Sequence, residues 1–189
     1  LMEQLNEHLT LAEAGVMLSP EQLGGIAVFA VSCRRTASYL ARGESSEEAV
    51  ASSGRSFVSL AALQAEIEQC VNNDRLHHEA SPLLTSTRRK IENQEAQIKE
   101  KLSRILQASK KYLADDYITN RGGRYVLPIQ RKHQAQFAGT VIELSGKGST
   151  VFMEPSAISK LQDELMSLTI EEDAEVRRIL YTLSSAVAE

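Results

Sequence analysis

An apolar side chain recurs at every seventh position through the middle of the chain, and this repeat constrains the fold more than any other feature. The repeated positions are Leu84, Ile91, Ile98, Ile105 and Tyr112, with Leu102 on the neighbouring seam. A seven-residue repeat makes a helix with a narrow apolar seam, which needs a long partner helix to cover it. Ser81 and Pro82 are typical of the N-cap and first position of a helix. We therefore predict one long helix over residues 81–116.

The last part of the chain supplies the predicted partner helix. Its apolar residues follow helical spacing and are Ile158, Leu161, Leu165, Leu168, Val176, Ile179, Leu183 and Val187. Thirty residues of helix span about 45 Å. Residues 81–116 and 156–189 are therefore predicted to pair as two long antiparallel helices, joined by an insert of different character.

The insert, residues 117–155, is predicted to form a small antiparallel sheet because Val, Ile, Thr, Tyr and Phe dominate it. Gly122-Gly123 is typical of a tight hairpin turn, and Gly146-Lys147-Gly148 predicts a second hairpin. Pro128 has no N–H to donate, so its strand is predicted to lie at a sheet edge or to be bulged there. The stretch QRKHQAQFA between the hairpins is expected to be a positively charged loop.

The first 80 residues are predicted to be a helical core segment. Ser19 and Gln22 have the spacing of a capping box, with Pro20 at the first helical position. The sequence SLAALQAEIEQCV predicts a further helix, NNDRLHHEA a turn or loop, and residues 43–56 a polar break or a short helix. Aromatic residues make up only 5% of the chain, which suits helices packed through Leu, Ile and Ala. The predicted fold class is therefore mainly α, with a small sheet at the tip of a helical hairpin.

The net charge of −4 hides an uneven distribution along the chain. Residues 81–148 contain thirteen Lys or Arg and six Asp or Glu, a balance of +7, which leaves −11 for the remainder. The final predicted helix is acidic. Within the insert, we expect a set of five cations to face only one acid, Glu143; the cations are Arg121, Arg124, Arg131, Lys132 and Lys147.

These five cations are the candidate nucleic-acid-binding residues. Each Lys or Arg that neutralises a phosphate releases counterions, which gives affinity that is independent of sequence and sensitive to salt. Arg121, Arg124 and Lys147 lie at or beside predicted turns, where side chains reach solvent. Alternatively, the turn charges only promote solubility, and the basic and acidic helices pair with each other. A coiled-coil module that docks a protein, or an RNA-binding arm like those of some synthetases, also remains open, although such arms usually end in a short turn.

Motifs for catalysis, metals and cofactors are incomplete. In SGKGST, Gly148 follows Lys147 where a P-loop needs Ser or Thr, so we predict a hairpin turn. His77-His78 is no metal pair because adjacent side chains diverge, and we find no nucleophile beside a base. Cys33 and Cys70 are read as small buried residues in a reducing compartment. We therefore expect no catalytic site, metal or cofactor in this chain.

The remaining expectations concern the surroundings of the chain. No segment resembles a signal peptide, and no apolar run approaches the roughly 20 residues that cross a membrane. We therefore expect a cytoplasmic protein. The sequence opens within a helical pattern and closes on LSSAVAE without a Gly or Asn stop, so we expect more protein at both ends.

A specific pattern of residues runs through Ala80-Ser81-Pro82, a long helix, Ile118-Thr119, Gly123-Arg124-Tyr125-Val126, Pro128, Gly139, the turn from Ser145 to Ser149, Phe152, Glu154 and Pro155. In this pattern residues 74 to 189 strongly resemble the middle of the bacterial MutS-two proteins, the MutS paralogues that are not devoted to mismatch repair. Residues 1–73 match more loosely, mainly at GVMLSPEQL. The HHEA sequence departs from the polar or acidic run that the family more often has before Ala-Ser-Pro.

The resemblance implies an architecture of four parts. Residues 1–80 would be a helical core segment, 81–116 an ascending lever helix, 117–155 a β clamp and 156–189 a descending lever helix. In MutS-like proteins such a clamp contacts the nucleic-acid backbone. The resemblance therefore implies that the five cations of the insert contact phosphates.

The resemblance also implies properties of a longer parent protein. A P-loop domain that uses ATP and Mg²⁺, and a nuclease-like Smr domain, would lie beyond these residues, so ATPase and endonuclease activity would belong to the parent. Parent proteins of this branch are associated with suppressing recombination at branched DNA and with splitting collided ribosomes. The implied partners are therefore DNA or ribosomal RNA, bound by a homodimer whose clamps close around the substrate.

Overall fold

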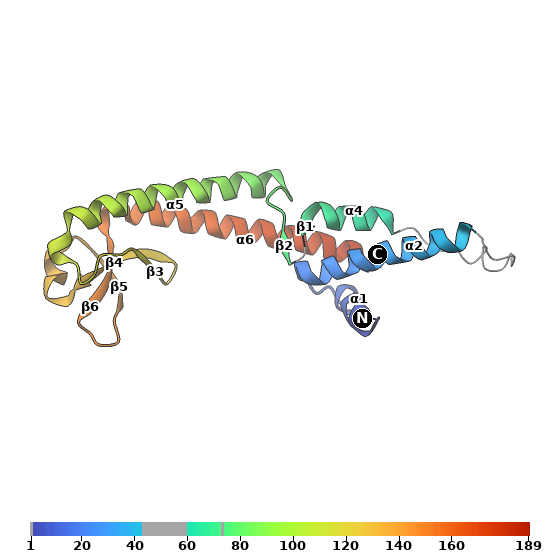
Figure 1. Ribbon diagram of the computed structural model, residues 1–189, viewed down its shortest axis with the longest axis horizontal. Helices are drawn as coiled ribbons and strands as arrows, with labels where there is room; N and C mark the ends of the chain where they lie inside the picture. Colours follow the sequence, from blue (N-terminus) through green and yellow to red (C-terminus); the bar gives the residue numbers. More distant parts are fainter. Residues whose placement is uncertain (1, 43–59, 73) are drawn as a thin grey trace. The chain divides into compact units, whose positions relative to one another are not determined.

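The computed structural model describes residues 2–42, 60–72 and 74–189. The polar break or short helix predicted at 43–56 lies outside the described residues. The chain forms two compact units, which we treat separately (Figure 1). Unit 1 comprises Leu1–Thr85 and Asp173–Glu189, and unit 2 comprises Ser86–Glu172.

Unit 1 is helical, with α1 (Met2–Glu13), α2 (Pro20–Arg42) and α4 (Ala61–Cys70). It also contains the start of α5 (Pro82–Ala108) and the last part of α6 (Ser159–Ala188). The core of unit 1 draws on all five helices and includes Ala12, Leu18, Leu23, Ile67, Leu84, Ile179 and Leu183.

The predicted capping box at the start of α2 is confirmed. The Gln22 N–H donates to Ser19 Oγ at 3.2 Å, and the Ser19 N–H donates to Gln22 Oε1 at 2.8 Å. The turn or loop predicted after α4 is instead a short antiparallel hairpin of β1 (Val71–Asn72) and β2 (Arg75–Leu76). The strands are too short for the sequence to show the alternation of buried and exposed residues that predicts a strand. Only Val71 and Leu76 are buried in the core.

The start of α5 is tied to α6 by a buried carboxylate. Ser81 Oγ accepts the Leu84 N–H at 3.0 Å, which confirms the predicted cap, and donates to Glu175 Oε1 at 2.7 Å. Arg178 donates to both carboxylate oxygens of Glu175, at 2.7 and 2.8 Å. These Arg178 bonds, helped by Ser81 and opposed by burial, lower the pKa of Glu175 from an ordinary 4.5 to about 2.

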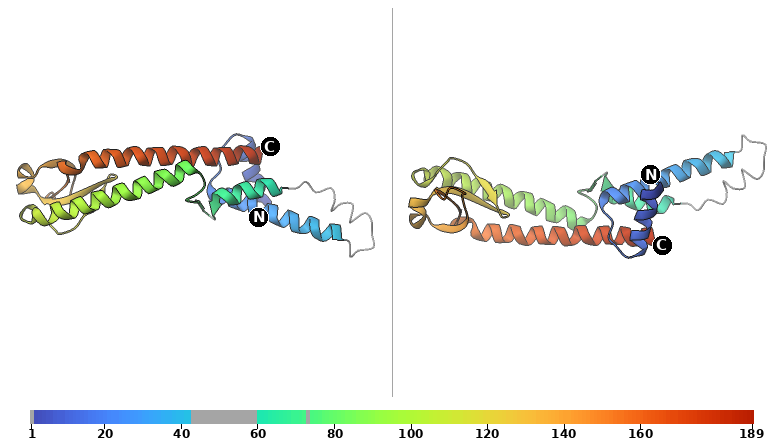
Figure 2. Two further views of the ribbon diagram at one scale, coloured as in Figure 1. Left: turned by 90° about the horizontal axis from the view of Figure 1, so that it is seen from above. Right: turned by 90° about the horizontal axis from the view of Figure 1, so that it is seen from below.

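In unit 2 the helices α5 and α6 lie side by side, as the seven-residue repeat predicted (Figures 1 and 2). Ile98 and Leu102 are fully buried in the same core as Leu165 of α6. Polar bonds join the pair as well, since Gln94 Nε2 donates to the Leu161 carbonyl at 3.0 Å. The antiparallel pairing of the two helices is therefore confirmed.

The helix α5 ends at Ala108, before the predicted limit of 116. The Ser109 N–H is shared between the carbonyls of Ile105 and Leu106, which tightens the last turn. A 3₁₀ helix, η1 (Lys110–Tyr112), follows and holds the last residue of the seven-residue repeat. Another 3₁₀ helix, η3 (Ser156–Ile158), precedes α6.

The insert is a four-stranded antiparallel sheet with strand order β3-β4-β6-β5. Its strands are β3 (Thr119–Arg121), β4 (Arg124–Gln130), β5 (Gly139–Leu144) and β6 (Thr150–Pro155). Both predicted hairpins are confirmed. Gly122 and Gly123 have φ values of 58° and 81°, which glycine adopts without strain and which suit a two-residue turn. A mainly α fold with a small antiparallel sheet is thus confirmed.

Pro128 lies in β4, which is an interior strand of the sheet. The prediction of an edge position is nevertheless correct locally, because the ladder with β3 ends at Val126. On that side the Pro128 carbonyl accepts the Ala114 N–H at 2.8 Å, and the N–H that proline lacks would point the same way. No ladder bond is therefore lost.

The charged loop predicted between the hairpins is wrong in its conformation. Residues Arg131–Gln136 form a 3₁₀ helix, η2. Phe137 follows it into the core of unit 2, where Leu127, Ile129, Val151 and Met153 of the sheet meet the two long helices.

Among the helices that the structure describes, none is long and apolar enough to span a membrane.

Candidate nucleic-acid interface

The sheet of unit 2 separates the five predicted cations into two groups at opposite ends of β4. Arg121 and Arg124 flank the β3–β4 turn. Arg131 and Lys132 follow the other end of β4, and Lys147 lies in the β5–β6 turn. Strands rise about 3.3 Å per residue, so the length of β4 places the two groups about 20 Å apart along the strand.

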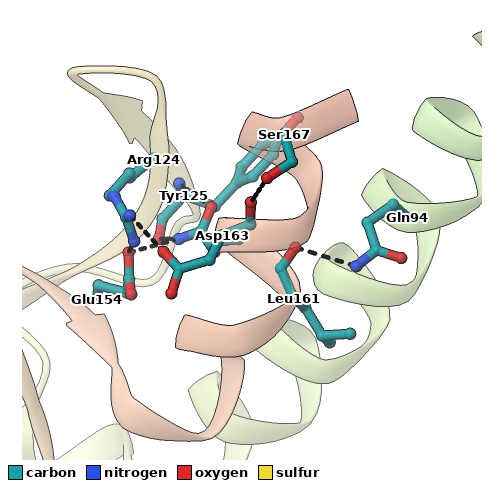
Figure 3. A network of polar contacts seen from close by, with 8 residues as sticks. Gln94, Arg124, Tyr125, Glu154, Leu161, Asp163 and Ser167 are labelled. Carbon is teal, nitrogen blue, oxygen red and sulfur yellow. Dashed lines mark hydrogen bonds and ion pairs between the residues drawn. The ribbon is translucent and has the colours of Figure 1, made fainter. Parts of the chain in front are cut away.

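Arg124 is held by carboxylates, and its side chain is only 24% exposed. Its Nη1 donates to Glu154 Oε2 at 2.7 Å, and its Nη2 donates to Asp163 Oδ1 at 2.6 Å (Figure 3). These bonds, with Glu154 first, raise the pKa of Arg124. The premise that Glu143 is the only acid near the insert cations is therefore wrong, since Glu154 lies in β6 and Asp163 in α6.

Arg121 is partly held as well. Its guanidinium carbon lies 4.5 Å from the centre of the Phe152 ring, and its Nε lies 3.7 Å from Glu143 Oε2. Stacking on an aromatic face stabilises a guanidinium group and fixes its plane. The side chain is 38% exposed, so part of the group still reaches solvent. We call Arg121 and Arg124 the paired end of the sheet.

Arg131 brings η2 against the β5–β6 turn. Its N–H donates to the Ser149 carbonyl at 3.0 Å, and its Nη1 donates to the Gly148 carbonyl at 3.2 Å. Lys132 and Lys147 are exposed on either side of this contact. None of these three cations forms a salt bridge with a carboxylate of residues 2–42, 60–72 or 74–189.

Two further lysines that the sequence analysis did not single out lie at the same end. Lys110 and Lys111 belong to η1 and are exposed. The η1 helix packs on η2 through Tyr112, whose ring centre is 5.5 Å from that of His133. The pattern offered one signal, because Tyr112 ends the seven-residue repeat and so marks the tip of the helical pair. We call Lys110, Lys111, Arg131, Lys132 and Lys147 the basic end of the sheet.

The chemistry of the basic end suits an anion without sequence-specific contacts. Exposed Lys and Arg side chains that lack carboxylate partners keep their donors free for phosphate oxygens. The β5–β6 turn itself is a hairpin, closed by the Gly148 N–H on the Ser145 carbonyl at 2.8 Å. The hairpin turn predicted at this position is thereby confirmed.

The described part of the chain contains no group of three His, Cys, Asp or Glu residues that could hold a metal ion. Neither Cys33 nor Cys70 forms a disulfide. The pKa of the Cys70 thiol is raised, mainly because the group is partly buried. Both are half-buried, whereas the sequence predicted buried residues, and Cys70 packs against the core of unit 1.

The sequence was also compared with known proteins. No protein-family model matches it. Curated proteins called endonuclease MutS2 do match over nearly the whole chain. The protein from Clostridium perfringens (strain SM101 / Type A) is 34% identical over 97% of the chain. Those from Symbiobacterium thermophilum and Alkaliphilus oremlandii are 36% and 31% identical over 99% and 100% of it.

The chain belongs to the MutS2 family. The predicted resemblance is thus confirmed, and it extends over residues 1–73, where the motifs alone matched loosely. The chain spans 24% of the length of each of these three MutS2 relatives. The word endonuclease in their names describes those longer proteins.

Proposed function

We propose that the sheet of unit 2 is the nucleic-acid clamp of a MutS2 protein and that its basic end binds the phosphate backbone. In this proposal residues 81–116 and 156–189 are lever helices, 117–155 are the clamp, and 1–80 belong to a helical core. The ligand is DNA, branched or duplex, or a structured RNA such as ribosomal RNA. The chain itself catalyses nothing and acts through binding.

The observation that carries the proposal is the set of exposed cations without a carboxylate partner at the basic end. Five exposed Lys and Arg residues lie on η1, η2 and the β5–β6 turn, and none has a salt bridge within the described residues. Elsewhere in unit 2 carboxylates neutralise several of the basic side chains, as Glu172 does for Arg88 at 2.8 Å. An unneutralised cluster at a turn favours an external anion.

We extend the proposal to the longer protein on the strength of the family. A MutS2 parent would bind ATP and Mg²⁺ in a separate domain and transmit movement through the lever helices to the clamp. It would act as a homodimer in suppression of recombination or in rescue of collided ribosomes, with any endonuclease activity in another domain. The names of the relatives support a role on nucleic acid.

One observation favours a second candidate, a coiled-coil module that docks a protein through its sheet. The strand β5 is an edge strand, and its Val141 and Leu144 are 38% and 51% exposed. An edge with exposed apolar side chains can pair with an extended segment of a partner. This candidate predicts no salt-sensitive affinity for nucleic acid.

The test is binding of the 189-residue chain to fluorescent ligands, measured by anisotropy. The ligands are a four-way DNA junction, a plain duplex and a structured RNA, at about 50 and about 200 mM salt. The test variant changes Arg131, Lys132 and Lys147 to Glu. The matched control changes Arg89, Lys90 and Lys160 of the long helices to Glu, which gives the same change in net charge outside the basic end.

The proposal expects salt-sensitive binding that the test variant loses and the control variant largely keeps. The ranking of the three ligands would then separate recombination substrates from ribosomal ones. Equal loss in both variants would show that only net charge matters and would contradict a specific basic end. Absence of binding at low salt would favour the protein-docking module.

A further inference from the structure

One side chain of α6 completes the hydrogen-bonding of β4. Gln162 is only 3% exposed. Its Oε1 accepts the Tyr125 N–H at 2.9 Å, and its Nε2 donates to the Tyr125 carbonyl at 2.8 Å. A neighbouring antiparallel strand makes this reciprocal pair of bonds with the residue opposite. A helix side chain therefore takes the place of a strand at this point of the sheet.

The sheet register explains why a substitute is needed at Tyr125. The ladder between β4 and β6 ends at the pair Leu127–Met153, and the same register continued by two residues would set Tyr125 opposite Pro155. Pro155 is the last residue of β6, and proline has no N–H to donate. Without Gln162, the Tyr125 carbonyl would lack a hydrogen-bond donor at the margin of the core of unit 2.

Gln162 also extends the bonding to a buried ion pair. Its Nε2 lies 3.0 Å from Glu154 Oε2, and Glu154 is 2% exposed. The same carboxylate oxygen accepts Arg124 Nη1, and Arg124 reaches back to Asp163 on α6 (Figure 3). Directional bonds thus run from α6 to β4 and β6 and return to α6. We call Gln162, Glu154 and Arg124 the joint.

Stability alone gives little reason for a polar joint here. Apolar packing already holds the sheet on the helices, through Leu127, Met153 and Leu165. Well-packed apolar residues often replace a buried ion pair with no loss of stability. Apolar contact is non-directional, however, whereas hydrogen bonds require narrow angles and distances. The joint therefore adds a defined orientation.

We propose that Gln162 is a positioning residue that fixes the angle of the sheet on α6. Through that angle it sets the direction in which the basic end is presented. The first part of the inference concerns unit 2 alone, and the second part rests on the proposed nucleic-acid function. Glu154 and Arg124 support Gln162 in this role and do not contact the ligand.

The test measures the distance between one spin label on the sheet and one on α6. Thr140 of β5 and Glu171 of α6 are exposed and lie outside both the joint and the basic end. Both are changed to Cys, with Cys33 and Cys70 changed to Ser. Double electron–electron resonance gives the distance distribution, and anisotropy gives the affinity for a DNA duplex. Circular dichroism confirms that each variant is folded.

Gln162→Leu removes the amide at nearly constant volume. The expected results are a broader distance distribution and a roughly five-fold weaker affinity, because an ordering cost then falls on binding. Gln162→Glu sets two carboxylates against each other and is expected to broaden the distribution further. Adding Glu154→Gln to Gln162→Glu restores a hydrogen-bond donor between the two positions and should narrow the distance distribution again. Gln97→Leu is the control, because Gln97 is exposed on α5 outside the joint and is expected to leave the distribution unchanged.

Each outcome decides the inference. An unchanged distribution in Gln162→Leu would overturn the joint, and a broadened one with unchanged affinity would overturn its role in positioning. If the double variant with Gln162→Glu and Glu154→Gln does not narrow the distance distribution, this would also contradict the pairing of Gln162 with Glu154. If the unmodified chain binds no duplex, the proposed function fails, yet the distance measurement still decides whether the joint exists.

Discussion

The two ends of β4 carry the same kinds of side chain and use them in opposite ways. At the paired end, Arg124 is bound between Glu154 and Asp163, and Arg121 stacks on Phe152. At the basic end, Lys132 and Lys147 extend into solvent without a carboxylate. The contrast shows that a basic residue near a turn indicates a binding site only when its acidic neighbours in space are known.

The contrast also gives each end its own expected response to mutation. Changes at the paired end should affect the stability of unit 2 before they affect binding, because its cations offset buried carboxylate charge. Changes at the basic end should affect binding and leave stability nearly unchanged, because its cations are solvated.

The largest expected effect is at the paired end. Glu154→Ala leaves Arg124 and Gln162 without their shared acceptor, and we expect a loss of about 3 kcal/mol in the free energy of unfolding. The matched control is Glu143→Ala, since Glu143 is half exposed and 3.7 Å from its arginine. We expect at most about 1 kcal/mol there. Urea unfolding at neutral pH measures both values, and equal losses would contradict a distinct paired end.

Arg178 in unit 1 is also held by a carboxylate, that of Glu175, and the pH dependence of stability tests this pairing. The pKa of Glu175 falls from an ordinary 4.5 to about 2 on folding. Its contribution is therefore complete above about pH 4.5 and is lost as the pH falls towards about 2. We expect Glu175→Gln to lower the free energy of unfolding by about 2 kcal/mol at pH 7.

Urea unfolding of the unmodified chain and of Glu175→Gln, repeated at falling pH, measures this contribution. The difference between the two proteins should shrink below about pH 4.5. A difference that stays constant down to the acid limit would mean that Glu175 is not held as a carboxylate by Arg178 and Ser81.

A smaller effect separates the two hairpin turns. Gly123 has φ of 81° and Gly148 has φ of 66°, so Ala at either position should cost about 1 kcal/mol of stability. Only at Gly148 does a new Cβ meet a cation of the basic end, because Arg131 Nη1 would lie 3.3 Å away. We expect Gly148→Ala to weaken duplex binding about two-fold and Gly123→Ala to leave it unchanged. Weaker binding in Gly123→Ala would blur the distinction between the ends.

The last expected effect is on binding alone, with none on stability, and concerns the two lysines of η1. Changing Lys110 and Lys111 to Gln should weaken duplex binding about three-fold at low salt, with no change in thermal stability. The control changes Lys90 and Lys160, on the facing long helices, to Gln. If the control pair weakens binding as much, the basic end does not extend to η1.

Much of the fold could be predicted because local patterns determine it. The seven-residue repeat identified the helical pair, Ser81-Pro82 marked the start of α5, and Gly122-Gly123 marked the first hairpin. The end of α5 and the helix η2 could not be predicted in the same way. A 3₁₀ helix is too short to show a period, and here the packing of Tyr112 against His133 and Phe137 accompanies both.

The candidate site was harder to predict than the fold. Composition located positive charge in the insert, but Arg124 is neutralised by Asp163, which is 39 residues away in the sequence. The sequence did not predict a role for Gln162, because a glutamine on a helix is usually solvated. Its role arises from the register that, continued by two residues, would set Tyr125 opposite Pro155, and such a register is known only once the sheet is known.

The most direct test of the account is the salt dependence of duplex binding for three proteins, at a temperature where all are folded. Each phosphate contact contributes about −0.9 to the slope of log K against log salt, so three contacts contribute about −2.7. We predict that changing Arg131, Lys132 and Lys147 to Gln removes most of this slope, whereas Arg124→Gln leaves it intact. A slope that survives the triple change, or that Arg124→Gln reduces equally, would contradict the division of the sheet into a paired end and a basic end.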